Sequence, residues 1–207
     1  MQKKIAIFGG TFNPVHWGHL LIAETALHQC SLDQVLWVPT FHPPHKTAAL
    51  PAFEHRLTMV QRAIADHPNF ACSTIEAQHS GTSYAIDTLQ DLQTQQPNIR
   101  WFWIVGLDAF QTLPRWHNAP ELIAQCDWLV APRMKSPASQ GLGDERLQQG
   151  GDQLVRSLPL RWQILQMPLM EISSSLVRQH CRERRSIRYL VPETVRHYIL
   201  THQLYQT

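Results

Sequence analysis

Two histidines, His16 and His19, stand three residues apart just after a glycine pair, and their spacing suits phosphate chemistry. Imidazoles three residues apart share one face of a helix, where each can donate a hydrogen bond to a phosphate oxygen, more strongly when protonated. Gly9 and Gly10 allow a phosphate to approach the backbone. The stretch therefore predicts a strand, a phosphate-sized loop and a helix N-terminus, and it indicates nucleotide chemistry.

Two later segments carry groups that could hold further phosphates. Lys46 follows a proline-stiffened stretch and can act as a phosphate-seeking point charge, although a solvated loop lysine is equally ordinary. Ser173, Ser174 and Ser175 precede Arg178 by about one helical turn. Serines at a helix start are common N-caps, but three hydroxyls with an arginine also make a triphosphate grip.

The elements that must position these groups alternate between strand and helix patterns. Apolar runs predict strands at 4–8, 34–39, 70–75, 101–105, 128–131 and 162–166. Helical spacing predicts helices at 20–29, 53–66, 84–95, near Glu121, and at 174–184 and 192–201. The alternation predicts an α/β fold: a single Rossmann-like, doubly wound, mostly parallel sheet with helices on both faces and a C-terminal helical segment. Residues 1–207 then form one domain, and residues 135–151, rich in Ser, Gly, Gln and Pro, form a loop with a short helix.

Ligands bind such sheets beyond the carboxyl ends of the strands, and three further features fall there. Gly9 and Gly10 end the first expected strand. Asp108 lies just past the strand at 101–105, where it can contact a ligand or cap a helix. Trp116 lies in an expected loop, where its ring can be exposed to a ligand or packed in the core.

Composition narrows the class of protein. With 43% hydrophobic and 16% charged residues, the 207-residue chain is not expected to be disordered. A net charge of +2 argues against a strong electrostatic attraction to nucleic acids or to membranes. Four cysteines far apart, no apparent signal peptide and no membrane-length apolar run predict reduced thiols in a cytoplasmic protein.

Several common signatures are missing from the sequence. It contains neither GxGxxG nor GxxxxGK[ST], so the dinucleotide-cofactor and P-loop interpretations lose their motifs. No His/Cys spacing is typical of zinc, and no GxSxG elbow or Cys–His pair supports covalent catalysis. We therefore expect no dedicated metal site in the protein.

The chain resembles the (H/T)xGH nucleotidyltransferase superfamily in several segments. Residues 9–19 resemble its GGTFDPxHxGH motif, with Asn13 where many members have Asp. Residues 172–178 resemble its ISSTxxR signature with Ser175 for Thr, and residues 43–46 match PPHK. This resemblance implies that His16, His19, Lys46 and Arg178 hold and stabilise the reacting phosphates.

Within the superfamily, residues 82–89, 104–110 and 113–117 resemble the bacterial nicotinate mononucleotide adenylyltransferases. The resemblance implies transfer of an adenylyl group from ATP, accompanied by Mg²⁺, to nicotinate mononucleotide. Trp116 would stack on the pyridine ring, backbone amides near it and near 82–84 would hold the carboxylate, and Asp108 would bind a ribose hydroxyl. The implied acceptor residues are Lys46, Thr82, Ser83, Tyr84, Asp108 and Trp116. The implied ATP-binding residues are Gly9, Gly10, Thr11, Phe12, His16, His19, Gly106, Asp108, Arg133, Ser173, Ser174, Ser175 and Arg178.

Other functions stay open from the sequence alone. The acceptor could be nicotinamide mononucleotide or phosphopantetheine, and a non-catalytic nucleotide-binding module is the alternative from another class. The modest charge and the lack of a basic stripe count against a nucleic-acid binder. Self-association is left undecided.

Overall fold

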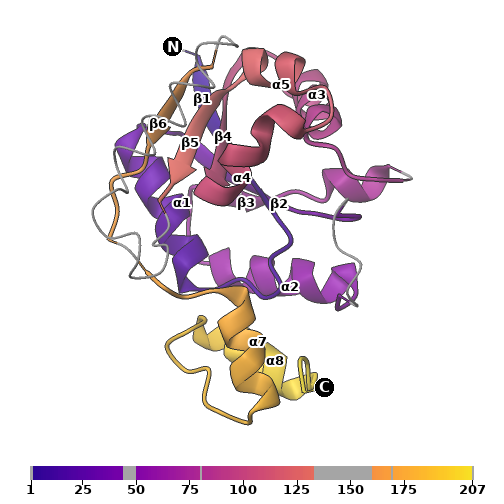
Figure 1. Cartoon of the computed structure of the whole chain (residues 1–207), viewed down its shortest axis with the longest axis vertical. Coiled ribbons are helices and arrows are strands. Elements are labelled where there is room, and N and C mark those ends of the chain that lie inside the picture. The colour runs from indigo at the N-terminus through magenta and orange to yellow at the C-terminus, as the bar shows by residue number, and fades with distance from the viewer. Residues whose placement is uncertain (1, 44–49, 80, 133–159, 169, 207) are drawn as a thin grey trace.

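The computed structural model describes residues 2–43, 50–79, 81–132, 160–168 and 170–206. Its centre is a six-stranded sheet in the order β3-β2-β1-β4-β5-β6, in which every neighbouring pair is parallel (Figure 1). The strands are β1 (Lys3–Gly10), β2 (Gln34–Pro39), β3 (Phe70–Cys72), β4 (Ile99–Gly106), β5 (Asp127–Ala131) and β6 (Trp162–Ile164). The predicted doubly wound, parallel sheet is confirmed, and the strand order reverses between β1 and β4.

Helices follow most of the strands and end the chain. The α-helices of the described residues are α1 (Trp17–Gln29), α2 (Phe53–Ile64), α3 (Ala85–Gln95), α4 (Leu107–Thr112), α5 (Ala119–Gln125), α7 (Ser174–Arg182) and α8 (Glu193–Thr201). Two 3₁₀ turns, η1 (Ile75–Gln78) and η2 (Leu113–Arg115), precede α3 and α5. Among the residues described, none of the helices has the length and apolar character needed to cross a bilayer.

Alternating side chains of β1 feed two separate cores. Ala6 and Phe8 pack with residues of α1, α2, α7 and α8, whereas Ile5 and Ile7 pack with residues of α3, α4 and α5. Both faces of the sheet are therefore covered, as predicted, because successive strand residues point to opposite faces. Figure 1 shows α7 and α8, in orange and yellow, as a C-terminal helical segment beside α2.

The structure departs from the sequence predictions mainly in short elements. The expected strand at 70–75 ends at Cys72, and Ile75 instead begins η1. Helix α4 was not expected because its six residues are too few to show helical periodicity. The prediction for residues 135–151 lies outside the described residues.

Candidate active site

The carboxyl ends of β1 and β4 bring the predicted glycines to one edge of the sheet. Phe8 pairs with Ile104 across β1 and β4, and Gly10 and Gly106 are the last residues of these strands. The loops that leave β1 and β4 diverge because the strand order reverses here, and this is where open α/β sheets bind ligands.

The loop after β1 has little room for a larger residue than glycine. A Cβ atom at Gly10 would approach the Phe12 ring to 3.1 Å. Phe12 has a φ of 47°, and its ring packs edge-on against Phe8 at 5.5 Å and against His19 at 5.2 Å between ring centroids. The loop is thus folded back over the end of β1, with its aromatic ring beside the first turn of α1.

The two predicted histidines lie together at the start of α1. His16 is the N-cap residue, and its ring stacks on that of His19 with 3.7 Å between centroids. The backbone N–H of His16 donates to Nδ1 of His19 at 3.2 Å. Because Nδ1 of His19 accepts, its ring proton resides on Nε2, which leaves an Nε2–H donor for a ligand.

Burial keeps both imidazoles neutral. It lowers the pKa of His16 from 6.5 to about 4. Burial, and then the neighbouring His16, lower the pKa of His19 well below 6.5. At neutral pH both rings are therefore neutral, and the charged form considered from the sequence is disfavoured in the free protein.

Close packing explains the glycine between the histidines. A Cβ atom at Gly18 would lie 3.0 Å from Nδ1 of His16 and 3.4 Å from the carbonyl oxygen of Ile172. Nδ1 of His16 and Oδ1 of Asn13 are buried and have no hydrogen-bond partner among the described residues. Leaving buried polar atoms unpaired costs free energy, so these atoms mark a place that a polar ligand can fill.

The serine-rich segment is joined directly to this loop. Ser173 caps α7 by accepting a hydrogen bond from Leu176 N–H at 3.2 Å. Ser174 Oγ donates to the carbonyl oxygen of Pro14 at 2.8 Å. Arg178 donates from Nη1 to the carbonyl oxygen of Asn13 at 2.8 Å and from Nη2 to Ser175 Oγ at 3.2 Å. Two segments more than 150 residues apart are therefore joined by the Ser174 hydroxyl and the Arg178 guanidinium.

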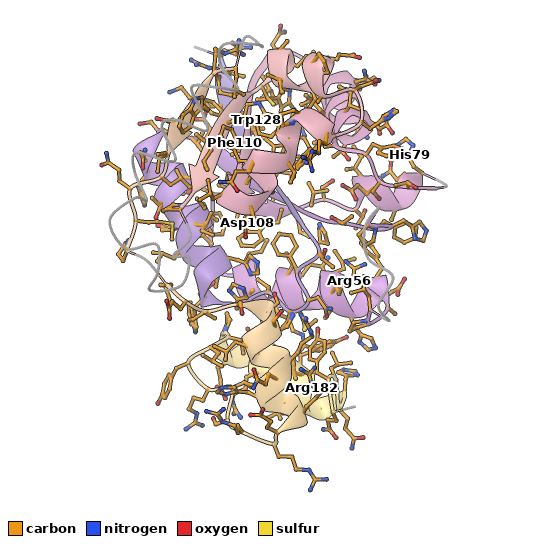
Figure 2. The ribbon with its side chains drawn as sticks, viewed as in Figure 1. Arg56, His79, Asp108, Phe110, Trp128 and Arg182 are labelled. Atoms are coloured by element: carbon orange, nitrogen blue, oxygen red, sulfur yellow. The ribbon has the colours of Figure 1, made fainter. Side chains whose placement is uncertain are left out.

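Asp108 lies at the same edge of the sheet, on α4 (Figure 2). Gly106, not Asp108, is the N-cap residue of α4, so the capping role considered for this carboxylate is wrong. Asp108 stands in the first helical turn and is exposed. A Cβ atom at Gly106 would meet nothing within 4 Å, so the space in front of this backbone is open.

The expected acceptor residues come from two loops. Ser83 N–H donates to the His42 carbonyl oxygen and Ser83 Oγ accepts from His42 N–H, both at 3.1 Å. Tyr84 stacks on His117 with 4.3 Å between ring centroids, so the loop before α3 meets the loop after η2. The N–H of Ser83 is thus already used within the protein.

Trp116 is both packed and accessible. Its ring is half-buried and meets Trp128 edge-on at 6.1 Å, and its Nε1–H donates to Thr112 Oγ1 at 3.3 Å. Its backbone N–H donates to the Leu113 carbonyl oxygen at 3.0 Å. A ring fixed in this way suits stacking, whereas this backbone N–H is not free for a carboxylate. Lys46 and Arg133 lie outside the described residues.

Sequence reasoning missed Arg56, which is only 2% exposed. It shares the buried face of α2 with Met59, Val60 and Ala63. The spacing of these four residues is visible in the sequence, where it places an arginine in an otherwise apolar helical stripe, and this is the signal that could have identified Arg56.

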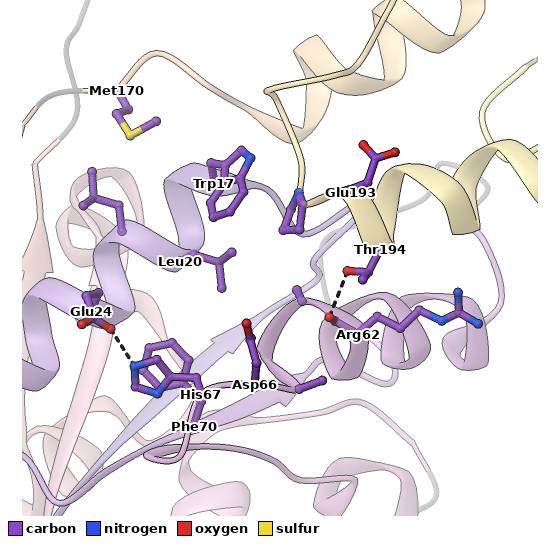
Figure 3. Close-up of a pocket in the computed structure, with 14 residues that line it drawn as sticks. Trp17, Leu20, Glu24, Arg62, Asp66, His67, Phe70, Met170, Glu193 and Thr194 are labelled. Atoms are coloured by element: carbon purple, nitrogen blue, oxygen red, sulfur yellow. Dashed lines mark hydrogen bonds and ion pairs between the residues drawn. The ribbon is translucent and has the colours of Figure 1, made fainter.

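A separate cavity of about 830 Å³ lies on another face of α1 (Figure 3). Trp17, Leu20 and Glu24 line it from α1, and Arg62 lines it from α2. The residues that line this cavity include neither His16 nor His19. This outer cavity is therefore distinct from the edge where the glycines and histidines gather.

Comparisons with known proteins agree with the motifs. Residues 7–180 match the Cytidylyltransferase-like family model. A probable nicotinate-nucleotide adenylyltransferase of Trichormus variabilis is 53% identical over 99% of this chain and 98% of the relative. One from Gloeobacter violaceus is 41% identical over 99% of this chain and 97% of the relative. The chain belongs to the cytidylyltransferase-like family.

Solved structures show the same fold. The nicotinic acid mononucleotide adenylyltransferase of Plasmodium falciparum, complexed with NaAD, superposes with a TM-score of 0.78 at 20% identity, covering 98% of this chain and 97% of that one. Its complex with APC gives a TM-score of 0.75. The Rossmann-like α/β fold of the cytidylyltransferase-like family is thus confirmed for this chain.

Proposed function

We propose that the protein transfers the adenylyl group of ATP to nicotinate mononucleotide, giving nicotinate adenine dinucleotide and pyrophosphate, a step of NAD biosynthesis. The names of relatives up to 53% identical support this activity. Residues 1–207 work as one nucleotidyltransferase domain, since strands from β1 to β6 share one sheet. The cysteines, free in the structure, support a reduced, cytoplasmic setting.

The observation that carries the proposal is the histidine pair at the strand-order reversal. A phosphate oxygen of the acceptor attacks the α-phosphorus of ATP, a new P–O bond forms, and the bond to the β-phosphate oxygen breaks to release pyrophosphate. The acceptor phosphate is already ionised at neutral pH, so no general base is required. The reaction then depends on alignment and on stabilising charge, which the Nε2–H of His19 and the ring of His16 provide.

ATP lies over the end of β1 in this proposal. Gly9, Gly10, Thr11 and Phe12 offer close backbone approach, and Gly106 and Asp108 contact the ribose side. The phosphates are bordered by Ser173 at the N-cap of α7, by Ser174, Ser175 and Arg178 within α7, and by Arg133. The bonds from Ser174 and Arg178 to the loop after β1 support this placement, because they hold α7 beside the histidines.

The acceptor lies across the neighbouring loops. Trp116 stacks on the pyridine ring, with its own ring held by the bond to Thr112. The carboxylate is bound near Thr82 and Tyr84, since the N–H groups of Ser83 and Trp116 have partners within the protein. Lys46 holds the acceptor phosphate.

Magnesium accompanies ATP in the proposed reaction. Within the described residues no group of three His, Cys, Asp or Glu side chains could hold a metal ion. Two oxygen donors border the site, the Asp108 carboxylate and the unpaired Asn13 Oδ1. They fit an ion bound chiefly through phosphate oxygens and water, which would offset phosphate charge.

The deciding experiment incubates purified protein with ATP and Mg²⁺ and one acceptor at a time: nicotinate mononucleotide, nicotinamide mononucleotide or phosphopantetheine. Product is identified by chromatography and pyrophosphate is quantified. We expect the highest kcat/KM with nicotinate mononucleotide. A higher kcat/KM with another acceptor refutes the proposed substrate, and ATP binding without release of pyrophosphate from ATP in the presence of any of the three acceptors refutes the enzymatic activity.

A further inference from the structure

Arg56 is a buried cation that links two loops at the carboxyl edge of the sheet. From α2 (Figure 2), its Nη1 donates to the carbonyl oxygens of Thr11 at 3.0 Å and Thr40 at 2.7 Å. Its Nη2 donates to the carbonyl oxygen of Phe41 at 3.4 Å. Thr11 follows β1 and leads to the histidines, whereas Thr40 and Phe41 follow β2. One guanidinium therefore fixes the spacing between the loops after β1 and β2.

Burying an arginine among carbonyl oxygens costs free energy, so the presence of Arg56 needs an explanation other than packing. Its Nε is buried and has no partner among the described residues, and burial lowers its pKa. Packing alone would be served better by an apolar side chain of similar size, as replacement of buried charges often shows. The planar, forked guanidinium is instead the group that can bind several carbonyls in a fixed geometry.

Glu76 holds the other side of the same peptide. Its carboxylate accepts from Phe41 N–H at 3.1 Å and from Thr88 Oγ1 at 3.2 Å. Phe41 is thus held at its N–H by Glu76 and at its carbonyl oxygen by Arg56. Burial raises the pKa of Glu76, while hydrogen bonds from Ser83, Phe41 and Thr88 and the charge of Arg56 oppose that shift.

The network ends at the loop before α3. The hydroxyl of Ser83 reaches both Glu76 and the N–H of His42, and the N–H of Ser83 returns to the His42 carbonyl oxygen. The loops after β1, after β2 and before α3 are consequently joined by the buried Arg56, the half-buried Glu76 and the hydroxyl of Ser83.

We propose that Arg56 and Glu76 are positioning residues that hold the acceptor-side loops, residues 40–42 and 82–84, at a fixed distance from the histidine loop, residues 11–19. The inference rests on the proposed function, because that function assigns to the acceptor the loop before α3 and Lys46, which follows residues 40–42 in the sequence, and assigns the histidine loop to ATP. Arg56 and Glu76 act through the backbone groups that they bind. Their effect is on alignment, where a displacement of about 1 Å can cost on the order of a hundredfold in rate.

The test compares Arg56→Lys, Glu76→Ala and Glu76→Gln. Lysine keeps the charge but loses the fork. Glutamine keeps an acceptor for Phe41 N–H, and its amide can donate to the hydroxyls of Thr88 and Ser83. Arg62→Lys is the matched control, because Arg62 lies on the same helix but lines the outer cavity (Figure 3). Steady-state kinetics, calorimetry with ATP and Mg²⁺, and hydrogen–deuterium exchange of the loops are measured on the full chain.

For Arg56→Lys and Glu76→Ala we expect the KM for nicotinate mononucleotide to rise and kcat to fall, each about tenfold. The Kd for ATP should change by less than about threefold, exchange should increase in residues 40–42 and 82–84, and Glu76→Gln should recover most of the loss. Arg62→Lys should resemble the parent protein.

Unchanged exchange and KM in the folded variants overturn the inference. So does an equal loss of ATP and acceptor affinity that glutamine does not rescue, because that indicates general destabilisation. If Arg56→Lys does not fold, the two Glu76 variants decide alone. If the parent protein forms no product with any acceptor, the proposed function fails, whereas the exchange data still test the network.

Discussion

The backbone N–H of His16 donates to Nδ1 of His19 across the first turn of α1, at 3.2 Å. One imidazole thereby does two things with two atoms. Nδ1 satisfies a backbone donor that no helical carbonyl can reach, and Nε2 keeps a proton that it can donate. Because the two atoms differ, substitution can separate the capping role from the donor role.

Replacing His19 tests that separation. Asparagine places an oxygen near the position of Nδ1 but nothing at Nε2, whereas alanine removes both. We expect kcat to fall on the order of 10²–10³-fold in both His19→Asn and His19→Ala, as for loss of one electrostatic donor. The free energy of unfolding should stay closer to the parent value in His19→Asn. Near-normal turnover in His19→Asn would show that the ring acts only as a cap.

The lowered pKa values of His16 and His19 predict how the free energy of unfolding depends on pH. The pKa of His16 is about 4 in the folded protein and 6.5 ordinarily, so between these values the unfolded chain binds more protons. Its contribution is complete above pH 6.5 and is lost as the pH falls toward 4, by up to about 1.4 kcal/mol per pH unit. His19 contributes in the same direction.

Urea unfolding of the parent protein and of His16→Gln across this pH range measures the effect. The slope of unfolding free energy against pH should be smaller in His16→Gln. His28→Gln is the control, since it removes an imidazole that is 75% exposed. Identical slopes for the parent and His16→Gln would contradict a neutral, buried His16.

Two glycines at the site should respond differently to alanine. In Gly18→Ala the new Cβ would lie 3.0 Å from Nδ1 of His16, so the ring must move. We expect kcat to fall about tenfold or more without global unfolding. Gly106→Ala meets no protein atom within 4 Å and should keep the parent stability, while the KM for ATP rises if the nucleotide lies there. Equal stability and kinetics in Gly18→Ala and the parent would refute the close fit.

Trp116→Ala should weaken binding of the acceptor more than binding of ATP. Loss of a stacked aromatic ring costs about 1–3 kcal/mol by analogy with base stacking, so the KM for nicotinate mononucleotide should rise about tenfold or more. Trp116→Phe keeps a ring but loses the hydrogen bond to Thr112. Its KM for nicotinate mononucleotide should lie between those of the parent protein and Trp116→Ala. An equal rise in the KM for ATP and in the KM for nicotinate mononucleotide would contradict the stacking role of Trp116.

The long elements and the first loop were predictable because their signals are local. β2 matches its predicted bounds, Gln34–Pro39, and His16 and His19 lie on one face of α1, as their spacing required. Helix α4 was not predicted, since six residues give no reliable period. The tautomer of His19 and the neutrality of the pair depend on burial and on a backbone donor, which the sequence does not display.

Arg56 shows another limit of the sequence. Its position beside Met59 and Val60 indicates burial, but its partners are carbonyl oxygens in two loops whose path depends on the whole sheet. The serines illustrate the converse. Their N-cap role was one of two alternatives that the sequence left open, and it is seen at Ser173, while the bond from Ser174 to Pro14 spans 160 residues and could not be inferred from local pattern.

The bonds from Ser174 to Pro14 and from Arg178 to Asn13 span 160 and 165 residues. During synthesis the loop with the glycines and histidines leaves the ribosome first. Helix α7, which carries Ser174 and Arg178, is made only after most of the chain has been translated. A nascent chain ending before α7 would carry the histidines without the helix that braces their loop. The proposed activity should therefore appear only once α7 has been translated and has packed against this loop.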